Sequence, residues 1–277
     1  MHIAQALAQA HDLGVERLDA QLLLAHVLQQ SRAWLIAHDE YRLGDTERQV
    51  YLSALDRRGA GEPLAYLIGE REFYGLLLEV GPDVLVPRPE TEGLVDWALE
   101  CLANEPRNAP TPCVVDLGTG SGAIALAVAR HAPQAAVAAT DASAAALAVA
   151  RRNAARHGLA VEWLHGDWWA PLAGRQFFLA VANPPYVAGG DPHLLTLRHE
   201  PRGALTPGGD GLAALRRIID GAPLHLLPGA WLLLEHGLDQ AVAVQALMRR
   251  RGFSAAITRA DLAGLPRCTG AAWPPQS

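Results

Sequence analysis

The pattern of apolar and polar residues divides the chain into two differently organised parts. In residues 1–63 the apolar side chains recur at helical spacing, as Ile3 and Leu7 do, which predicts a small bundle of amphipathic helices. Residues 70–80 instead form two short apolar runs on either side of Gly75, which predicts a β-hairpin. The chain therefore changes from a helix-forming to a strand-forming pattern near residue 69.

From Cys113 onward, short apolar runs alternate with helical segments. This order is typical of a parallel sheet whose strands are joined by crossover helices. Strands are expected at residues 114–117, 137–140, 161–164, 177–181 and 230–234, with a final strand pair at 253–258 and 268–273. Helices are expected at residues 124–131, from the second strand to about His157, and through Val242 and Leu247. We therefore predict an α/β fold with seven strands.

The same patterns suggest three regions along the chain. We expect a helical domain at residues 1–68, a hairpin linker at 69–89 and a larger α/β domain at 90–277. Thr91 stands where its hydroxyl could cap the first helix of the larger domain. The segment from Asn104 to Pro112 is rich in Pro and Asn and is expected to be a loop within that domain.

Composition excludes several classes of protein. The chain of 277 residues has a formal net charge of −6, and all of its basic residues are Arg, so non-specific binding to nucleic acid is not expected. Its three cysteines are scattered, which predicts neither a disulfide framework nor a metal site and fits the cytoplasm. No apolar run reaches the ~18 residues that a membrane span needs, and no secretory signal is recognisable.

Polar or Gly-rich residues stand at the ends of four predicted strands, where ligands bind in such sheets. The first strand ends in Asp116-Leu117-Gly118-Thr119-Gly120-Ser121-Gly122, whose glycines permit a tight turn and a close approach to a ligand. Asp141 ends the second strand and could accept hydrogen bonds from a ribose diol. Asp167 and Trp168 follow the third, where a carboxylate could take an adenine amino hydrogen and an indole could lie against the base.

Each of these features also has an alternative explanation, either another ligand or an ordinary structural role. The glycine loop satisfies G-x-G-x-x-[GA] with Ala123, so it could serve a nicotinamide or flavin dinucleotide. Asp141 could be a helix cap, and Trp168 with Trp169 could be core aromatic residues. S-adenosylmethionine is favoured because Asp116, just before the first glycine, could hold the ammonium of that cofactor. The fourth strand also ends in a corner that could accept an NH2 group, which hydride transfer does not need.

That feature is the corner Asn183-Pro184-Pro185-Tyr186, which follows the apolar run 177–181. Proline cannot donate to a sheet ladder and fixes its own φ, so the strand should stop there with its carbonyl groups held in set directions. An Asn oxygen, a nearby carbonyl and a flat Tyr ring would suit a planar NH2 group. A simple proline turn after a strand is the alternative.

The glycine loop and the corner together resemble those of class I S-adenosylmethionine-dependent N-methyltransferases. Further segments narrow the resemblance to the HemK-type peptide chain release factor glutamine methyltransferases, and it covers essentially the whole chain. These segments are Gly61–Gly69, Phe73–Gly75, Val84–Glu92, His199–Pro201, Leu233–Gly237 and Asp261–Gly264.

The resemblance implies a seven-stranded Rossmann-like sheet, with a small N-terminal helical domain that helps to dock a release factor. It implies methylation of the N5 side-chain amide of Gln in the Gly-Gly-Gln motif of bacterial class 1 release factors. S-adenosyl-L-methionine would be held at Gly118, Thr119, Gly120, Ser121, Gly122, Asp141, Trp168 and Asn183, with the segment 87–92 over it. The substrate Gln would be held by Asn183, Pro184, Pro185 and Tyr186.

Three further functions remain open from the residues alone. A nucleic-acid aminomethyltransferase acting on adenine or cytosine shares the corner, but the charge balance argues against the basic groove it would need. The glycine loop is also compatible with a non-catalytic nucleotide-binding module or with a dehydrogenase.

Overall fold

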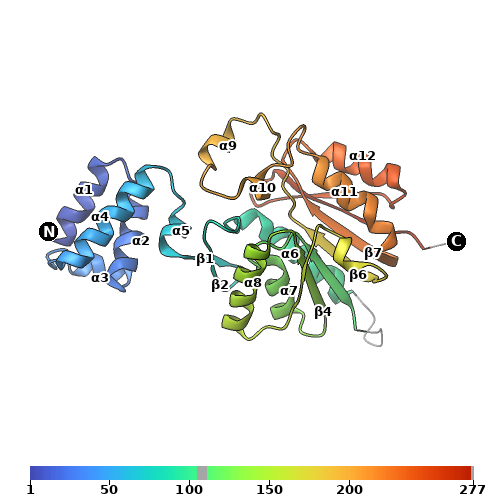
Figure 1. Cartoon of the computed structure of the whole chain (residues 1–277), viewed down its shortest axis with the longest axis horizontal. Helices are drawn as coiled ribbons and strands as arrows, with labels where there is room; N and C mark the ends of the chain where they lie inside the picture. Colours follow the sequence, from blue (N-terminus) through green and yellow to red (C-terminus); the bar gives the residue numbers. More distant parts are fainter. Residues whose placement is uncertain (105–110, 276–277) are drawn as a thin grey trace. The chain divides into compact units, whose positions relative to one another are not determined.

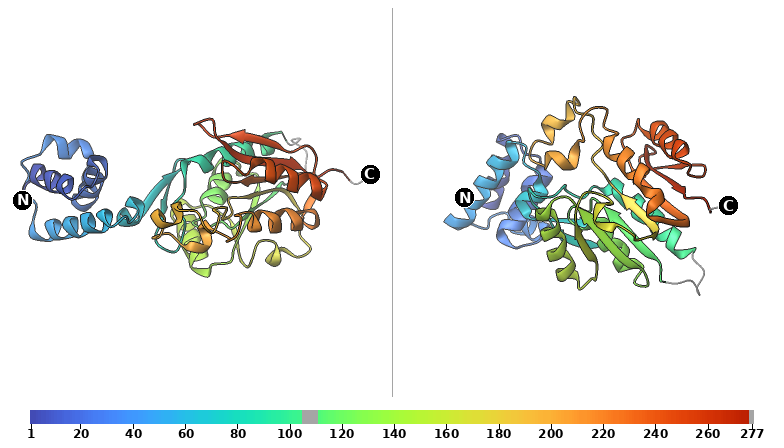
Figure 2. Two further views of the ribbon diagram at one scale, coloured as in Figure 1. Left: turned by 90° about the horizontal axis from the view of Figure 1, so that it is seen from above. Right: turned by 45° about the vertical axis from the view of Figure 1, so that its right-hand side comes forward.

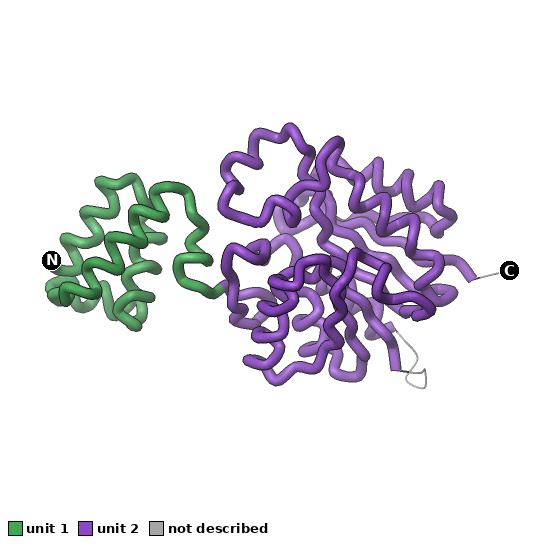
Figure 3. The backbone as a smooth tube through the Cα atoms, in the orientation of Figure 1, with its two compact units in different colours: residues 1–70 green, residues 71–277 purple. Residues whose placement is uncertain are grey.

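The computed structural model describes residues 1–104 and 111–275, which divide into two compact units, Met1–Glu70 and Arg71–Ser277 (Figure 3). The first unit is helical, as its pattern predicts. Its apolar core includes Ile3, Leu24 and Leu55, all fully buried. The helices that supply this core and its surroundings are α1 (Ile3–Asp12), α2 (Arg17–Leu28), α3 (Arg32–Ala37), α4 (Asp45–Gly59) and α5 (Leu64–Ile68) (Figure 1).

The predicted hairpin is confirmed: strands β1 (Glu70–Phe73) and β2 (Leu76–Glu79) pair with each other. Its two-residue turn has positive φ at both positions, 50° at Tyr74 and 76° at Gly75. Two consecutive left-handed residues match the twist of a hairpin, and the second of them is the glycine that separates the two apolar runs.

The described part of the second unit contains a seven-stranded sheet in the order β5-β4-β3-β6-β7-β9-β8, so the predicted α/β class and strand number are confirmed. All neighbours pair in parallel except β9, which is antiparallel to both β7 and β8. The strands are β3 (Cys113–Leu117), β4 (Ala136–Asp141), β5 (Glu162–His165), β6 (Phe177–Ala182), β7 (Leu226–Glu235), β8 (Ile257–Ala260) and β9 (Pro266–Ala272). Strand order reverses between β3 and β6, which places a ligand-binding crevice at their carboxyl ends.

Successive strand residues face opposite sides of this sheet, and each side carries its own apolar core. Val114 packs into the core formed with helices α6 (Glu92–Ala103), α7 (Ala123–His131) and α8 (Ala144–His157). Val115 packs into the core formed with α11 (Ala213–Gly221) and α12 (Ala241–Arg251). The helix layers on the two faces are visible in Figure 2. Near-continuous apolar runs such as 177–182 follow from burial on both faces.

Strand β7 begins at Leu226, four residues before the predicted start at Ala230. Pro228 and Gly229 lie inside the strand because the pairing with β6 is irregular there, passing from Phe177–Leu226 to Leu179–Trp231. A bulge of this kind accommodates a residue that cannot donate to the ladder.

Three other segments differ from the predicted pattern or lie outside the described residues. Strand β8 begins at Ile257 rather than at Phe253, whose side chain packs in the core against Trp273. Helix α11 does not follow from the predicted pattern. Residues 105–110 of the expected loop lie outside the described residues. Among the described helices, none is long and apolar enough to cross a membrane.

Candidate active site

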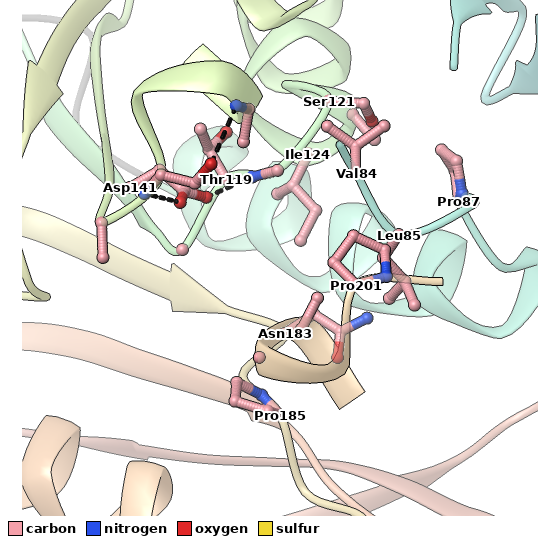
Figure 4. A pocket seen from close by; sticks show the side chains of 18 of the residues that line it. Val84, Leu85, Pro87, Thr119, Ser121, Ile124, Asp141, Asn183, Pro185 and Pro201 are labelled. Carbon is pink, nitrogen blue, oxygen red and sulfur yellow. Dashed lines mark hydrogen bonds between the residues drawn. The ribbon is translucent and has the colours of Figure 1, made fainter. Parts of the chain in front are cut away.

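A cavity of about 390 Å³ opens at the carboxyl ends of β3, β4 and β6 (Figure 4). This size is within the range of small-molecule sites. Of the residues predicted from sequence, the cavity is lined by Gly118, Thr119, Gly120, Ser121, Asp141, Asp167, Trp168, Asn183 and Pro185. Asp116, Gly122, Pro184 and Tyr186 are not among the residues that line it. The loop, Asp141 and Asn183 are therefore brought together around one space.

The glycine loop has the backbone conformation that its composition predicts. Gly118, Gly120 and Gly122 have φ of 75°, 56° and 86°, which other residues rarely adopt. A Cβ on Gly118 would lie 2.8 Å from Cζ3 of Trp168, so the indole packs directly against the loop backbone. The amides of Gly118 and Thr119 both donate to the Thr140 carbonyl, at 2.8 and 2.9 Å. The loop is thus held to β4 at its start.

Asp116 is buried behind the loop. Its Oδ2 accepts from the Thr119 hydroxyl at 2.6 Å and from the Ala125 amide at 3.2 Å, whereas Oδ1 has no partner among the described residues. Burial raises the pKa of this carboxyl to about 7. Asp116 therefore stabilises the loop and the start of α7 from behind, and its contact with a cofactor stays a prediction.

Asp141 fixes the loop from the other side. Its Oδ2 accepts from the Gly120 amide and its Oδ1 from the Ser143 amide, both at 2.8 Å (Figure 4). Helix α8 is capped by Ser143, which accepts from Ala146, so Asp141 is not the cap of that helix. Burial raises the pKa of Asp141, and the two amide donors oppose the rise. Each carboxylate oxygen keeps a second lone pair for a hydroxyl group in the cavity.

At the end of β5, Asp167 and Trp168 have different surroundings. The Asp167 carboxylate pairs with Arg217 at 2.5 Å, and both side chains are largely solvent-exposed. Trp168 has a φ of 50°, an unusual conformation for a bulky residue. This backbone turn places the indole against Gly118 on the cavity wall.

The corner after β6 is tied to two distant segments. Asn183 Nδ2 donates to the Thr91 hydroxyl at 3.0 Å, and Tyr186 donates its hydroxyl to Glu235 at 3.2 Å. The Tyr186 carbonyl accepts from Gln240 Nε2 at 2.9 Å. The prediction that Thr91 caps α6 is wrong: in the described structure its hydroxyl makes no cap bond and instead faces Asn183.

A buried ion pair between Arg88 and Glu200 is part of the site and could not be identified from the sequence. Glu200 is almost fully buried, pairs with the Arg88 guanidinium, and accepts from the Val86 amide at 3.0 Å. Arg88 and Pro201 both line the cavity, so this ion pair joins two segments of its wall. Figure 4 shows Pro201 beside Leu85 near Asn183. The one signal in the sequence is the segment His199–Pro201, which supports the family resemblance but does not indicate a partner for Glu200.

The chain is similar to known proteins over nearly its whole length. Residues 1–69 match the family described as PrmC N-terminal domain, and residues 91–229 match the methyltransferase small domain. A release factor glutamine methyltransferase of Bordetella pertussis is 52% identical over 94% of this chain and 96% of its own length. A release factor glutamine methyltransferase of Burkholderia pseudomallei is 49% identical over 94% of this chain and 93% of its own length. A T. thermophilus 16S rRNA N2 G1207 methyltransferase, solved with AdoMet and guanosine, shares the fold with a TM-score of 0.52 and 22% sequence identity. The match covers 73% of this chain and 49% of that chain.

Proposed function

The chain belongs to the family of release factor glutamine methyltransferases, and we propose that it methylates the N5 amide of a release-factor glutamine with S-adenosyl-L-methionine as donor. We propose further that the glutamine is that of the Gly-Gly-Gln motif of class 1 release factors. The observation that carries the site assignment is the meeting of the glycine loop, Asp141 and Asn183 at one cavity. Because residues 1–69 match the PrmC N-terminal domain, we also propose that residues 1–68 help to dock the release factor.

The cavity suits the proposed cofactor. Its volume of about 390 Å³ fits a small molecule, and its wall combines an acidic side chain, a flat indole and a glycine turn in which Gly118 has no room for a Cβ. Asp141 would accept from the ribose hydroxyls, Trp168 would lie against the base, and Asp167 would take the adenine amino hydrogen. Bound there, S-adenosyl-L-methionine supplies a methyl group on a sulfonium centre, which a nitrogen nucleophile can accept.

The corner would hold the substrate amide. A carboxamide nitrogen is a weak nucleophile because its lone pair is delocalised into the carbonyl. Asn183 Oδ1 and the Pro184 carbonyl would accept its two N–H groups, which fixes the amide and increases the charge on nitrogen. Tyr186 would pack near the amide plane. Catalysis by this chain would rest on orientation and electrostatic fit, effects that can supply ~7–11 kcal/mol when reacting groups are well placed.

Transfer to release factor tests the proposal. The unaltered protein, incubated with S-adenosyl-L-methionine and a class 1 release factor, should add one CH2 unit to the Gly-Gly-Gln peptide, as read by mass spectrometry. A parallel incubation with DNA tests the nucleic-acid alternative. Methyl transfer to DNA but not to release factor would refute the proposal.

The Asn183→Ala variant tests the role of the corner. It should lose methyl transfer by about 100-fold or more, as when one preorganised group is removed from an active site. Affinity for S-adenosyl-L-methionine, measured by calorimetry, should stay within a few-fold because the loop and Asp141 are unchanged. A variant with near-normal turnover would show that Asn183 does not hold the amide.

A further inference from the structure

We propose that Glu200 is a positioning residue, which keeps the cofactor cavity closed by fastening two segments of its wall to each other. These segments are residues 84–88, which precede α6, and residues 200–204, which lie between β6 and α11. The inference rests on the proposed function, since it concerns how the cavity retains S-adenosyl-L-methionine. Glu200 is not among the residues that line the cavity, so it would act through the wall rather than on the cofactor.

The two segments form a largely apolar part of the cavity wall. Val84, Leu85, Pro87 and Arg88 from the first segment line the cavity, together with Pro201, Gly203 and Ala204 from the second. Figure 4 shows Pro201 beside Leu85. Apart from Arg88, none of these side chains can form a hydrogen bond, so the lining itself offers little to hold the segments in one place. The polar contacts that join the segments come from Glu200, which is not part of the lining.

Both carboxylate oxygens of Glu200 bind the first segment. Oε1 accepts a hydrogen bond from Nη2 of Arg88, and Oε2 accepts one from the backbone amide of Val86 at 3.0 Å. The Glu200 side chain is only 2% exposed. Removing one member of a buried ion pair is strongly unfavourable, because it leaves a buried charge without compensation. The contact between residues 84–88 and 200–204 is therefore held by a charged group that needs both of its donors.

The second segment is the end of a longer excursion of the chain, residues 190–204. The Val187 amide donates to the Leu205 carbonyl at 3.0 Å, which closes the base of this excursion. All of residues 190–204 are described, and Glu200 is the only buried residue among them. A segment with so few buried apolar groups opens locally at a low cost in free energy. The buried anchor of this excursion is therefore a carboxylate rather than an apolar side chain.

The position of this wall should decide how tightly the cofactor is retained. A ligand that needs the closed wall binds with an apparent Kd equal to its intrinsic Kd divided by the closed fraction. Glu200 keeps that fraction close to one. The first segment continues into Thr91, whose hydroxyl accepts from Asn183 Nδ2 at 3.0 Å, so the closed wall also meets the corner. Once bound cofactor has closed the wall, the corner is in place and kcat should change little.

The Glu200→Gln variant tests the proposal. Glutamine keeps the length of the side chain, but it has one acceptor oxygen for two donors and carries no charge, so its NH2 group would face either Arg88 or the Val86 amide. The Kd for S-adenosyl-L-methionine, measured by calorimetry, should rise roughly 10- to 100-fold. The KM for this cofactor should rise with the Kd, whereas kcat for release-factor methylation at saturating cofactor should stay within a few-fold of the wild-type value.

Hydrogen exchange measures the opening of the wall without relying on activity. In Glu200→Gln, peptides that cover residues 84–88 and 200–204 should exchange faster than in the wild type, because the Val86 amide and the excursion lose their common anchor. Residues 118–122 should exchange as they do in the wild type. Saturating S-adenosyl-L-methionine should reduce the difference between the two proteins, since its binding favours the closed wall.

Glu79→Gln is the matched control, because Glu79 also pairs with an Arg from a distant segment, Arg152, at 2.6 Å. Neither residue lines the cavity, so this control should bind the cofactor as the wild type does. An unchanged or lower Kd in Glu200→Gln, an equal rise in the control, or unchanged exchange at residues 84–88 overturns the proposal while the proposed function stands. Absence of cofactor binding by the unaltered protein refutes the proposed cofactor and this role together. If Glu200→Gln does not fold, Arg88→Gln takes its place, with exchange at residues 200–204 as the readout.

Discussion

Replacing Glu235 with glutamine should stabilise the protein at neutral pH. Glu235 lies at the end of β7 with 1% of its surface exposed, and one of its oxygens, Oε2, has no partner among the described residues. Burial raises the pKa of its carboxyl from an ordinary 4.5 to about 7, against the opposing effect of Thr91, Tyr186 and Arg267. The folded protein therefore holds a proton on Glu235 over a pH range in which the unfolded chain has lost it.

The size and sign of the effect follow from this difference. Below pH 4.5 both states are protonated, and the carboxylic acid resembles the amide of Gln. As pH rises to about 7 the unfolded chain ionises first, so the folded state loses about 3 kcal/mol of stability relative to it. The Glu235→Gln variant has no such loss. Its advantage over the wild type should therefore grow by about 3 kcal/mol between pH 4.5 and 7.5.

Urea unfolding at several pH values, followed by tryptophan fluorescence, measures this difference. Six of the seven tryptophans lie in residues 71–277, so the signal reports the unit that contains Glu235. Glu100→Gln is the matched control, because Arg259 lowers the pKa of that exposed carboxyl; the control should be slightly destabilised above pH 4.5. A stability difference between Glu235→Gln and wild type that does not change with pH would refute the reasoning.

Two further predictions concern the cofactor end of the cavity. Gly118→Ala should destabilise the protein by more than the ~1–2 kcal/mol of a left-handed alanine and should weaken binding of S-adenosyl-L-methionine, because its Cβ would meet Trp168 at 2.8 Å. Gly174→Ala, with a similar φ of 74° and open space around it in the described structure, should show only the backbone cost in urea unfolding, and equal effects of the two would count against the packing argument. Asp141→Ala should raise the Kd for the cofactor roughly 10- to 100-fold in calorimetry, because charged acceptors of the Gly120 amide and the ribose are lost together; an unchanged Kd would remove Asp141 from the binding site.

The cofactor end could be predicted from sequence because it is built from residues close together in the chain. The turn after β3 needs its glycines for their positive φ, and Asp141 is the last residue of β4. Parallel pairing of β3 with β4 and β6 then brings these ends together without further information. The end of β6 at Asn183 follows from the same kind of apolar run and from the two prolines.

The substrate end could not be predicted in the same way, because its support comes from distant residues. Thr91 has the sequence context of a helix cap, and only the fold shows that its hydroxyl faces Asn183, which is 92 positions away. Glu200 reaches Val86 across a separation of 114 positions. The bulge at Pro228 likewise depends on the neighbouring strand. Local propensity cannot report contacts of this range.

Glu235 connects the stability and the proposed activity of this site. Its carboxyl accepts a hydrogen bond from the Tyr186 hydroxyl at 3.2 Å, and in the Glu235→Gln variant the amide could instead turn its NH2 group toward Tyr186. The Tyr186 hydroxyl would then lose its fixed partner, so the same substitution that stabilises the fold at pH 7 should lower kcat. A buried acidic group that weakens the fold is therefore expected where it holds a side chain of the active site, as in other sites that trade stability for function. A Glu235→Gln enzyme that is both more stable and fully active would separate the two effects and leave the buried charge without a role.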